Sequence, residues 1–107
     1  MALLRGTLDV MVLKALSWGP MHGFEIVNWL EDRSGGRLDV QDAALIQSLH
    51  RMEERSLIEA EWGITKNGRK ARYYRLTADG RASLKASAAD LREDMRVVAA
   101  ILDASRS

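Results

Sequence analysis

Basic side chains gather in one short stretch of the sequence. No acidic residue occurs between Trp62 and Ala78, whereas five basic residues do, namely Lys66, Arg69, Lys70, Arg72 and Arg75. A compact basic loop of this kind suits contacts with phosphate groups, and we expect Tyr73 to be exposed beside it. A charged turn that is simply solvated is the alternative interpretation. The stretch therefore predicts a nucleic-acid contact.

Polar side chains of a second kind lie on a helix that we predict over residues 42 to 55. Its outward positions are Gln47, Ser48, His50, Arg51 and Glu54, with Gln41 just before it. Glutamine and arginine can form paired hydrogen bonds with the edges of adenine and guanine in the major groove. An ordinary solvent-exposed helix face is the alternative. Because the basic loop follows this helix in the sequence, the two together predict a recognition helix and a wing that bind DNA.

Residues that could support catalysis or hold a metal are sparse. The chain has no cysteine and only two histidines, His22 and His50, which fall on different predicted helices. There is therefore no disulfide, thiolate zinc site or cysteine nucleophile, and neither histidine has a histidine partner four residues away. No serine occupies a Gly-x-Ser-x-Gly motif. We expect no enzymatic activity, no metal and no cofactor, and we expect His22 to be packed or hydrogen-bonded.

Length and charge place these residues in one globular domain. The chain has 107 residues, 47% of them hydrophobic, and 16 Lys+Arg against 15 Asp+Glu leave a net charge of +1. This balance excludes a disordered tail and a protein that binds nucleic acid through bulk positive charge. The uncharged stretch from Ala15 to Phe24 is short for a spanning helix, which needs about 20 apolar residues. Asp9 and Lys14 interrupt the opening apolar run, so we expect a cytoplasmic protein without a signal peptide.

Hydrophobic periodicity predicts the elements that must position the polar groups. Helices are expected over about residues 7–17, 23–34 and 42–55, with Thr7 and Asp42 as N-caps. Alternating residues at 58–62 and 72–76 predict two strands, joined by a turn at Asn67-Gly68. Residues 38–40 also alternate and predict a short strand. The order of helices followed by a hairpin is that of a winged helix-turn-helix, an α+β fold that is mainly α.

A last helix is predicted from Thr77 to about Ala104. It would be about 40 Å long, whereas the body formed by the other residues is no wider than roughly 30 Å, so part of it must overhang. Its apolar seam packs either on the chain's own first helix or against a second copy, and the overhang favours a homodimer. We therefore expect a DNA-binding part at 1–77 and a dimerisation helix at 78–107 in one continuous domain. The predicted dimerisation residues are Leu8, Met11, Leu84, Ala88, Leu91, Met95, Val98 and Leu102.

Several short blocks of the sequence carry a resemblance to a known family. They are Gly6-Thr7-Leu8-Asp9, Gly19-Pro20-Met21-His22-Gly23-Phe24-Glu25-Ile26, Leu49-His50-Arg51-Met52-Glu53 and Tyr73-Tyr74-Arg75-Leu76-Thr77, with Gly80 following. Over roughly residues 3 to 82 the chain resembles PadR-type transcriptional regulators, and its single last helix is similar to the compact branch of that family. The resemblance implies a homodimeric winged-helix repressor. By position it implies DNA contacts at Gln47, His50, Lys66, Arg69 and Lys70.

The front of the predicted recognition helix departs from that family's pattern. Where the family has Leu-Tyr-Pro, this chain has Leu45-Ile46-Gln47, which removes a tyrosine hydroxyl and adds a base-reading amide. The alternative function is a winged-helix module that binds another protein or dimerises without reading DNA. Acidic residues Glu54 and Glu59 interrupting the positive surface would favour that alternative. The predicted DNA-binding residues are Gln41, Ile46, Gln47, His50, Arg51, Lys66, Asn67, Arg69, Lys70, Arg72 and Tyr73.

Control by a small molecule is also implied by the resemblance, because many such regulators are released from DNA by a phenolic or drug-like ligand. The drug-sensing branch sandwiches flat ligands between aromatic side chains of its last helix, but residues 81–107 contain no aromatic residue. We expect Trp18 and Trp29 to pack in the core. A small apolar pocket between Met11 and Met95 or Met1 is the remaining candidate. The expected partners are a double-stranded DNA operator, a second copy and an unidentified small-molecule effector, with no membrane.

Overall fold

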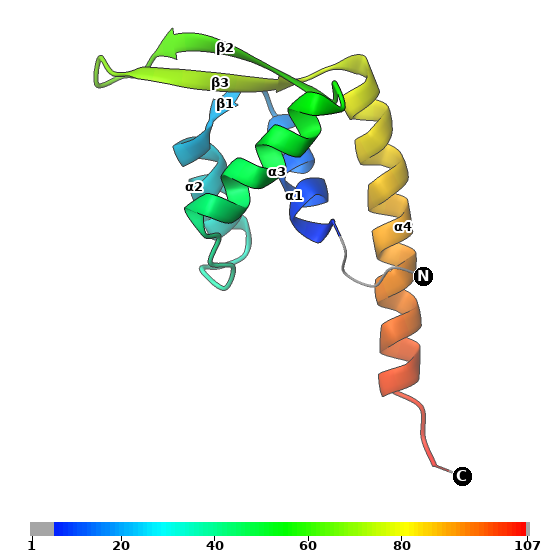
Figure 1. Ribbon diagram of the computed structural model, residues 1–107. Helices are drawn as coiled ribbons and strands as arrows, with labels where there is room; N and C mark the ends of the chain where they lie inside the picture. Colours follow the sequence, from blue (N-terminus) through cyan, green and yellow to red (C-terminus); the bar gives the residue numbers. More distant parts are fainter. Residues whose placement is uncertain (1–5, 107) are drawn as a thin grey trace.

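Four helices and a three-stranded antiparallel sheet make up the part of the chain, residues 6–106, that the computed structural model describes (Figure 1). The strands lie in the order β1-β3-β2, and the sheet covers one end of the helical body. This arrangement confirms the predicted winged helix-turn-helix, with the β2–β3 hairpin as the wing. In chain order the elements are α1 (Thr7–Leu16), β1 (Met21–His22), α2 (Gly23–Arg33), α3 (Asp42–Glu54), β2 (Ile58–Ile64), β3 (Lys70–Leu76) and α4 (Ala78–Leu102).

Apolar side chains from α1, α2, α3 and the sheet form one core. Leu16, Ile26 and Met52 are almost completely buried, and Ile58 joins them from the start of β2. The apolar spacing of α3 predicts that Leu45, Leu49 and Met52 point inward, and all three lie in this core. In α1 the 3–4 spacing predicts one apolar face, made of Leu8, Met11, Val12, Ala15 and Leu16, and the structure buries the last three of these. The buried residues there are Val12, Leu13, Ala15 and Leu16, whereas Leu8 and Met11 only pack against the edge of the core.

The N-caps of α1 and α3 differ from the predicted ones. The carbonyl of Gly6 accepts from the Val10 N–H at 3.1 Å, so α1 is capped by Gly6 and Thr7 is its first helical residue. Gln41 caps α3 without a side-chain hydrogen bond, and Asp42 instead lies in the first turn, where its charge still favours the helix N-terminus.

A reciprocal cap starts α2. The Glu25 N–H donates to Nδ1 of His22 at 3.3 Å, and the His22 N–H donates to Oε1 of Glu25 at 3.1 Å. The prediction that His22 is a hydrogen-bonded residue is therefore confirmed, and the pair fixes where the second helix begins.

The third strand of the sheet is not the predicted one. Residues 38–40 form no strand, and instead Met21 and His22 pair with Tyr74 and Tyr73 of β3. The physical reason is the cap of α2, which requires an extended backbone at His22 and so lays β1 beside β3. Leu38 and Val40 contribute by packing their side chains against the core.

The wing is longer than predicted and projects beyond the helices (Figure 1). Its strands pair from Ile58 with Leu76 to Ile64 with Lys70. The turn predicted at Asn67-Gly68 is confirmed, because the Gly68 N–H donates to the Thr65 carbonyl at 2.9 Å. Gly68 has φ +77°, a left-handed conformation that favours glycine.

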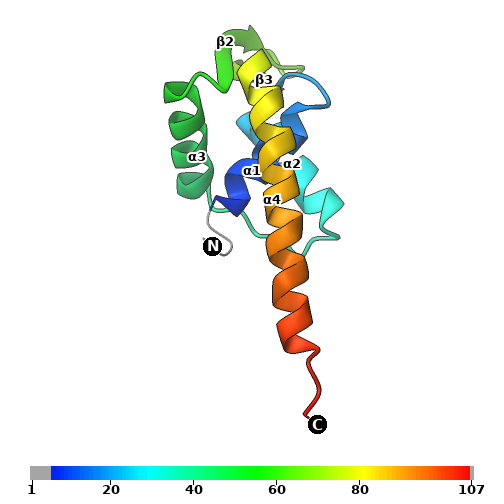
Figure 2. The ribbon, with the colours of Figure 1, turned by 90° about the vertical axis from the view of Figure 1, so that its right-hand side faces the viewer.

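The last helix, α4, leaves the body over its distal half (Figures 1 and 2). Thr77 caps it by accepting from the Gly80 N–H at 3.0 Å, which confirms the predicted start. The molecule measures 63 × 29 × 22 Å along its principal axes, so the predicted overhang is confirmed as well. Every helix within residues 6–106 is too short or too polar to cross a membrane.

Candidate nucleic-acid interface

One side of α3 is free of the rest of the molecule (Figure 2). Of the predicted contacts, Ile46, Gln47, His50 and Arg51 are exposed on this side, and Gln41 is exposed just before the helix. The prediction for Ser48 is wrong, because its side chain is wholly buried. Since successive residues turn by about 100°, the helix that buries Leu45, Leu49 and Met52 must also turn Ser48 inward.

Asp9 of α1 holds two residues of α3. The Ser48 hydroxyl donates to Oδ1 of Asp9 at 2.5 Å, and Nη2 of Arg51 donates to the same oxygen at 2.8 Å. Hydrogen bonding by Asp9, and then its charge, raise the pKa of Arg51, so the guanidinium remains positive. Because the Arg51 side chain is still 53% exposed, it is both anchored to α1 and accessible from solvent.

The five basic residues of the wing fall into two groups. Arg72 donates to Oε2 of Glu53 on α3 at 3.0 Å, and Arg75 donates to Oε2 of Glu59 at 2.9 Å. The other group, which we name the wing tip, consists of Lys66, Arg69 and Lys70. These three are exposed, and no ion pair within residues 6–106 compensates them. The uncompensated charge of the wing is therefore three rather than the predicted five.

Tyr73 is not the exposed aromatic side chain that we predicted. Its ring lies edge-on to the ring of His22, with 5.3 Å between centroids. It also lies over Gly63, where an added Cβ would be 2.8 Å from a Tyr73 ring carbon. The side chain is consequently half-buried, on the face of the sheet that carries Glu59 and Glu61.

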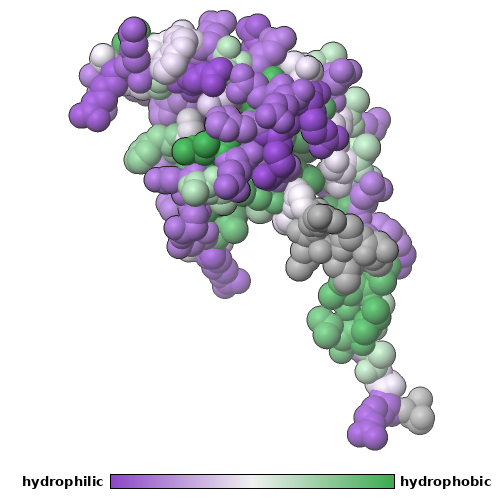
Figure 3. Space-filling view, viewed as in Figure 1, coloured by the Kyte–Doolittle hydropathy of each residue, from purple (hydrophilic) through white to green (hydrophobic). Residues whose placement is uncertain are grey.

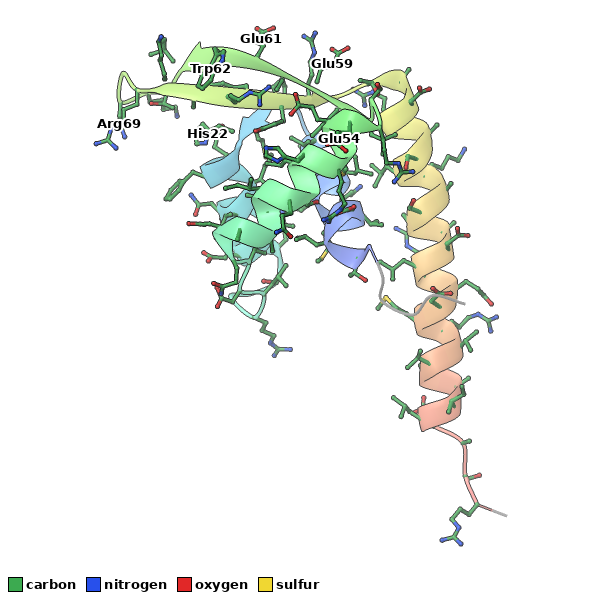
Figure 4. All side chains as sticks on the ribbon, in the orientation of Figure 1. His22, Glu54, Glu59, Glu61, Trp62 and Arg69 are labelled. Atoms are coloured by element: carbon green, nitrogen blue, oxygen red, sulfur yellow. The ribbon has the colours of Figure 1, made fainter. Side chains whose placement is uncertain are left out.

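The two acids that bear on the continuity of the positive surface lie in different places. Glu59 points away from the helices and is paired with Arg75, so it does not separate the wing tip from α3 (Figure 4). Glu54 is exposed towards the end of α3, and together with His50 and Glu53 it lines a shallow depression. The positive charge is therefore concentrated at the wing tip, whereas the adjoining surface of α3 carries acids.

Trp62 is a candidate residue that the sequence analysis missed. Its alternation with Ile58 and Ala60 predicted a half-buried strand face, yet Trp62 is 67% exposed and Ile64 is 64% exposed. The alternation is intact, but the wing runs past the helices and nothing within residues 6–106 covers its end. A signal was available, because the strand partners of Trp62 and Ile64 are charged, namely Arg72 and Lys70.

The predicted dimerisation residues become more exposed along α4. Leu84 packs against the core and Leu91 is half-buried, whereas Met95 is 57% and Leu102 77% exposed. Ile101 is exposed beside them, and Figure 3 shows apolar side chains gathered over this distal part of the helix. Within one copy, Met95 and Leu102 of the predicted seam are therefore uncovered, whereas Val98 between them is half-buried.

A groove of about 440 Å³ lies between α1 and α4. Its acidic lining residues are Asp9, Asp90, Glu93 and Asp94, and its basic lining residue is Arg55. Hydrogen bonds from Arg96, and then its charge, lower the pKa of Glu93, so this acid remains negative near neutral pH. The groove is distinct from the pocket predicted near Met11 and Met95, and Met1 lies outside the described residues.

The two tryptophans predicted for the core have different surroundings. Trp29 is half-buried against the core, but Trp18 is 65% exposed because it follows the last turn of α1 at the surface. The guanidinium of Arg33 lies over both rings, 5.5 Å from the Trp18 centroid and 5.3 Å from that of Trp29. The prediction is therefore wrong for Trp18.

Comparison with known proteins adds a family and a fold. The model of the transcriptional regulator PadR-like family matches residues 12–86. A relative from Lysinibacillus sphaericus, named uncharacterized protein X, is 32% identical over 82 residues, which are 77% of this chain and 75% of the relative. A transcriptional regulator structure from Clostridium thermocellum has a TM-score of 0.80 at 22% identity, covering 89% of this chain and 92% of that one. Bacillus subtilis PadR in complex with operator DNA has a TM-score of 0.66 at 20% identity, and the match covers 77% of this chain and 46% of that one.

Proposed function

Because the chain belongs to the PadR-like family of transcriptional regulators, we propose that it represses transcription by binding a double-stranded DNA operator as a homodimer. The observation that carries this proposal is the wing tip, three uncompensated basic residues on a hairpin beside the free side of α3. In this proposal residues 1–77 carry the DNA contacts and residues 78–107 the dimer contacts.

The free side of α3 is the surface that enters the major groove. Gln47 offers both a donor and an acceptor for base edges, and His50 lies one turn further along the same side. Gln41 and Ile46 contact DNA at the front of the helix. Support for DNA as the partner comes from Bacillus subtilis PadR, whose structure is described in complex with operator DNA.

The wing tip attracts the phosphate backbone, because its basic side chains make no ion pair among the described residues. Asn67 lies at the turn, between the basic residues Lys66 and Arg69. Arg51 and Arg72 act as contacts whose positions are already held by Asp9 and Glu53. Tyr73, although half-buried, is included among the proposed DNA contacts.

The distal half of α4 supports the homodimer. Fully burying each large side chain such as Met95 or Leu102 stabilises an assembly by about 1.5–3 kcal/mol, and one copy leaves these side chains in water. The apolar seam of α4 packs either against the same seam of the second copy or against α1 of the second copy. On α1 the residues Leu8 and Met11 are half-buried. Two joined copies would present two α3 helices to successive major grooves, roughly 34 Å apart.

The α1–α4 groove is the candidate location for an unidentified small-molecule effector. Asp9 forms part of its lining and also holds Ser48 and Arg51 of α3. A ligand in the groove that displaced Asp9 would therefore change the position of the recognition helix and release DNA.

The experiment that tests DNA binding is fluorescence anisotropy with a duplex from upstream of the protein's own gene. A shuffled duplex of equal length is the control, and salt is raised from about 50 to 200 mM, because phosphate contacts weaken steeply over this range. Preference for the upstream duplex that survives the higher salt supports a specific regulator. Equal binding to both duplexes that disappears with salt contradicts it.

Replacing the wing tip, K66A/R69A/K70A, should weaken binding to both duplexes and flatten the salt dependence. Each phosphate contact contributes about 0.9 to the slope of log affinity against log salt. The magnitude of this slope should therefore fall by roughly five in a homodimer, which carries two wing tips. The matched control is R81A/K85A/R92A, which removes the same charge from exposed positions of α4. An unchanged slope in the wing-tip variant would contradict the role of the wing.

The alternative function is a module that binds another protein without reading DNA. The acids Glu53 and Glu54 beside His50, and the exposed Ile46 at the front of α3, are the features that favour it. In that case the wild-type protein and K66A/R69A/K70A would both fail to distinguish the upstream duplex from the shuffled one.

A further inference from the structure

Two large apolar side chains stand exposed on one face of the wing. Trp62 is 67% exposed and Ile64 is 64% exposed, and both lie on β2 with one residue between them. Residues two apart on a strand share a face, so the two side chains form one apolar strip. This strip continues the core face of Ile58 and Ala60 beyond the helices that cover it (Figure 4).

Charged residues flank the strip on the neighbouring strand. Trp62 is paired with Arg72 and Ile64 with Lys70, and directly paired residues project from the same face of a sheet. Arg72 is already paired with other groups: it donates to Glu53, and its guanidinium lies 5.7 Å from the centroid of Tyr74. Within residues 6–106, no cation stacks on Trp62 and no acceptor takes its indole N–H.

Within residues 6–106, the indole of Trp62 makes no hydrogen bond or ring contact that would give it a role in holding the wing together. The other aromatic residue at the same level of the hairpin, Tyr73, is covered by His22 and packs over Gly63. Trp62 lies on the opposite face, where no aromatic ring in the described part of the chain covers it. An exposed indole whose N–H has no acceptor within residues 6–106 is available for a partner.

The charge beside the strip identifies the chemistry of that partner. Lys66, Arg69 and Lys70 attract a polyanion, and they repel the identical wing of a second copy of this chain. The minor groove of duplex DNA offers apolar deoxyribose edges along its walls and base acceptors on its floor. An indole supplies both an apolar surface and one N–H donor, which matches those groups.

We propose that Trp62 is a DNA-contacting residue, lying against the deoxyribose and base edges of a minor groove beside the phosphates that the wing tip contacts. Ile64 extends this contact towards the turn. The inference rests on the proposed DNA-binding function and adds an apolar contact to the predicted polar ones. Because an apolar contact releases no counterions from DNA, Trp62 contributes affinity without contributing to the salt slope.

The test compares W62T with W18T in the anisotropy assay on the upstream duplex. Threonine is a good strand residue, and Trp18 is about as exposed but follows α1, where its ring lies under the guanidinium of Arg33 of α2. We expect W62T to bind about tenfold or more weakly at every salt concentration with an unchanged salt slope, because an apolar contact is lost. We expect W18T to bind like the wild type, and both variants to keep the mass of the wild-type assembly.

A second measurement keeps the inference testable if W62T fails to fold. Tryptophan emission of the wild-type protein should be quenched when DNA is added, and W62F should lose this quenching whereas W18F retains it. Wild-type affinity and salt slope in W62T, with K66A/R69A/K70A still weak, would overturn the inference alone. A changed oligomeric mass in W62T would also overturn it. Wild-type protein that binds neither duplex would overturn the proposed function and the inference together.

Discussion

At the scale of single residues, the hydrogen bond between Ser48 and Asp9 fixes the packing of α3 against α1. The buried Ser48 hydroxyl has Asp9 as its acceptor, and the same carboxylate holds Arg51. D9A should lower the free energy of unfolding by about 1–3 kcal/mol, because it leaves a buried hydroxyl without a partner. Urea unfolding at one fixed protein concentration measures this change.

A double-mutant cycle with S48A separates this bond from general damage to α1. The coupling between the two substitutions should be about 0.5–3 kcal/mol, since removing both partners leaves no orphaned hydroxyl. Effects of D9A and S48A that simply add would mean that the bond contributes nothing to stability.

At the scale of elements, the start of α4 is fixed by a close approach that only glycine permits. A Cβ on Gly80 would stand 1.9 Å from the carbonyl oxygen of Leu57, which already accepts from the Thr77 N–H at 3.1 Å. G80A should therefore destabilise the protein by about 1–3 kcal/mol, although alanine is the better helix former. Thermal and urea unfolding check this prediction.

The matched control for this prediction is G23A at the start of α2. There an added Cβ meets only Leu45 Cδ2, at an ordinary distance of 3.8 Å. G23A should be neutral or stabilising by up to about 1 kcal/mol. Equal effects of G80A and G23A would mean that the packing of α4 on Leu57 is looser than the structure indicates.

At the scale of the whole molecule, the uncovered distal half of α4 predicts that the chain dimerises. Sedimentation equilibrium should give twice the 12.0 kDa mass of one chain. M95E/L102E should weaken association by at least about 100-fold, because it places charges in the apolar seam. The control A86E/A100E adds the same charges to exposed positions on the other side of α4. A monomeric wild-type protein, or a seam variant that associates normally, would contradict the prediction.

The sequence by itself determined the winged helix-turn-helix, because its elements follow from short-range patterns. Apolar spacing located α1 to α4, Asn67-Gly68 located the turn, and the length of α4 implied an overhang before any contact was known. These features depend on residues close together in the chain, where sterics and periodicity act directly. The blocks that resemble PadR-type regulators likewise indicated the family.

The tertiary structure alone decided which side chains are free. Ser48, Arg72 and Arg75 looked like exposed polar residues, yet each is occupied by an acid distant in the sequence or across the wing. Trp62 looked like a core residue and is exposed, while Tyr73 looked exposed and is covered. Alternation along a strand determines the two faces of a sheet, but only the packing of other elements determines which face meets water.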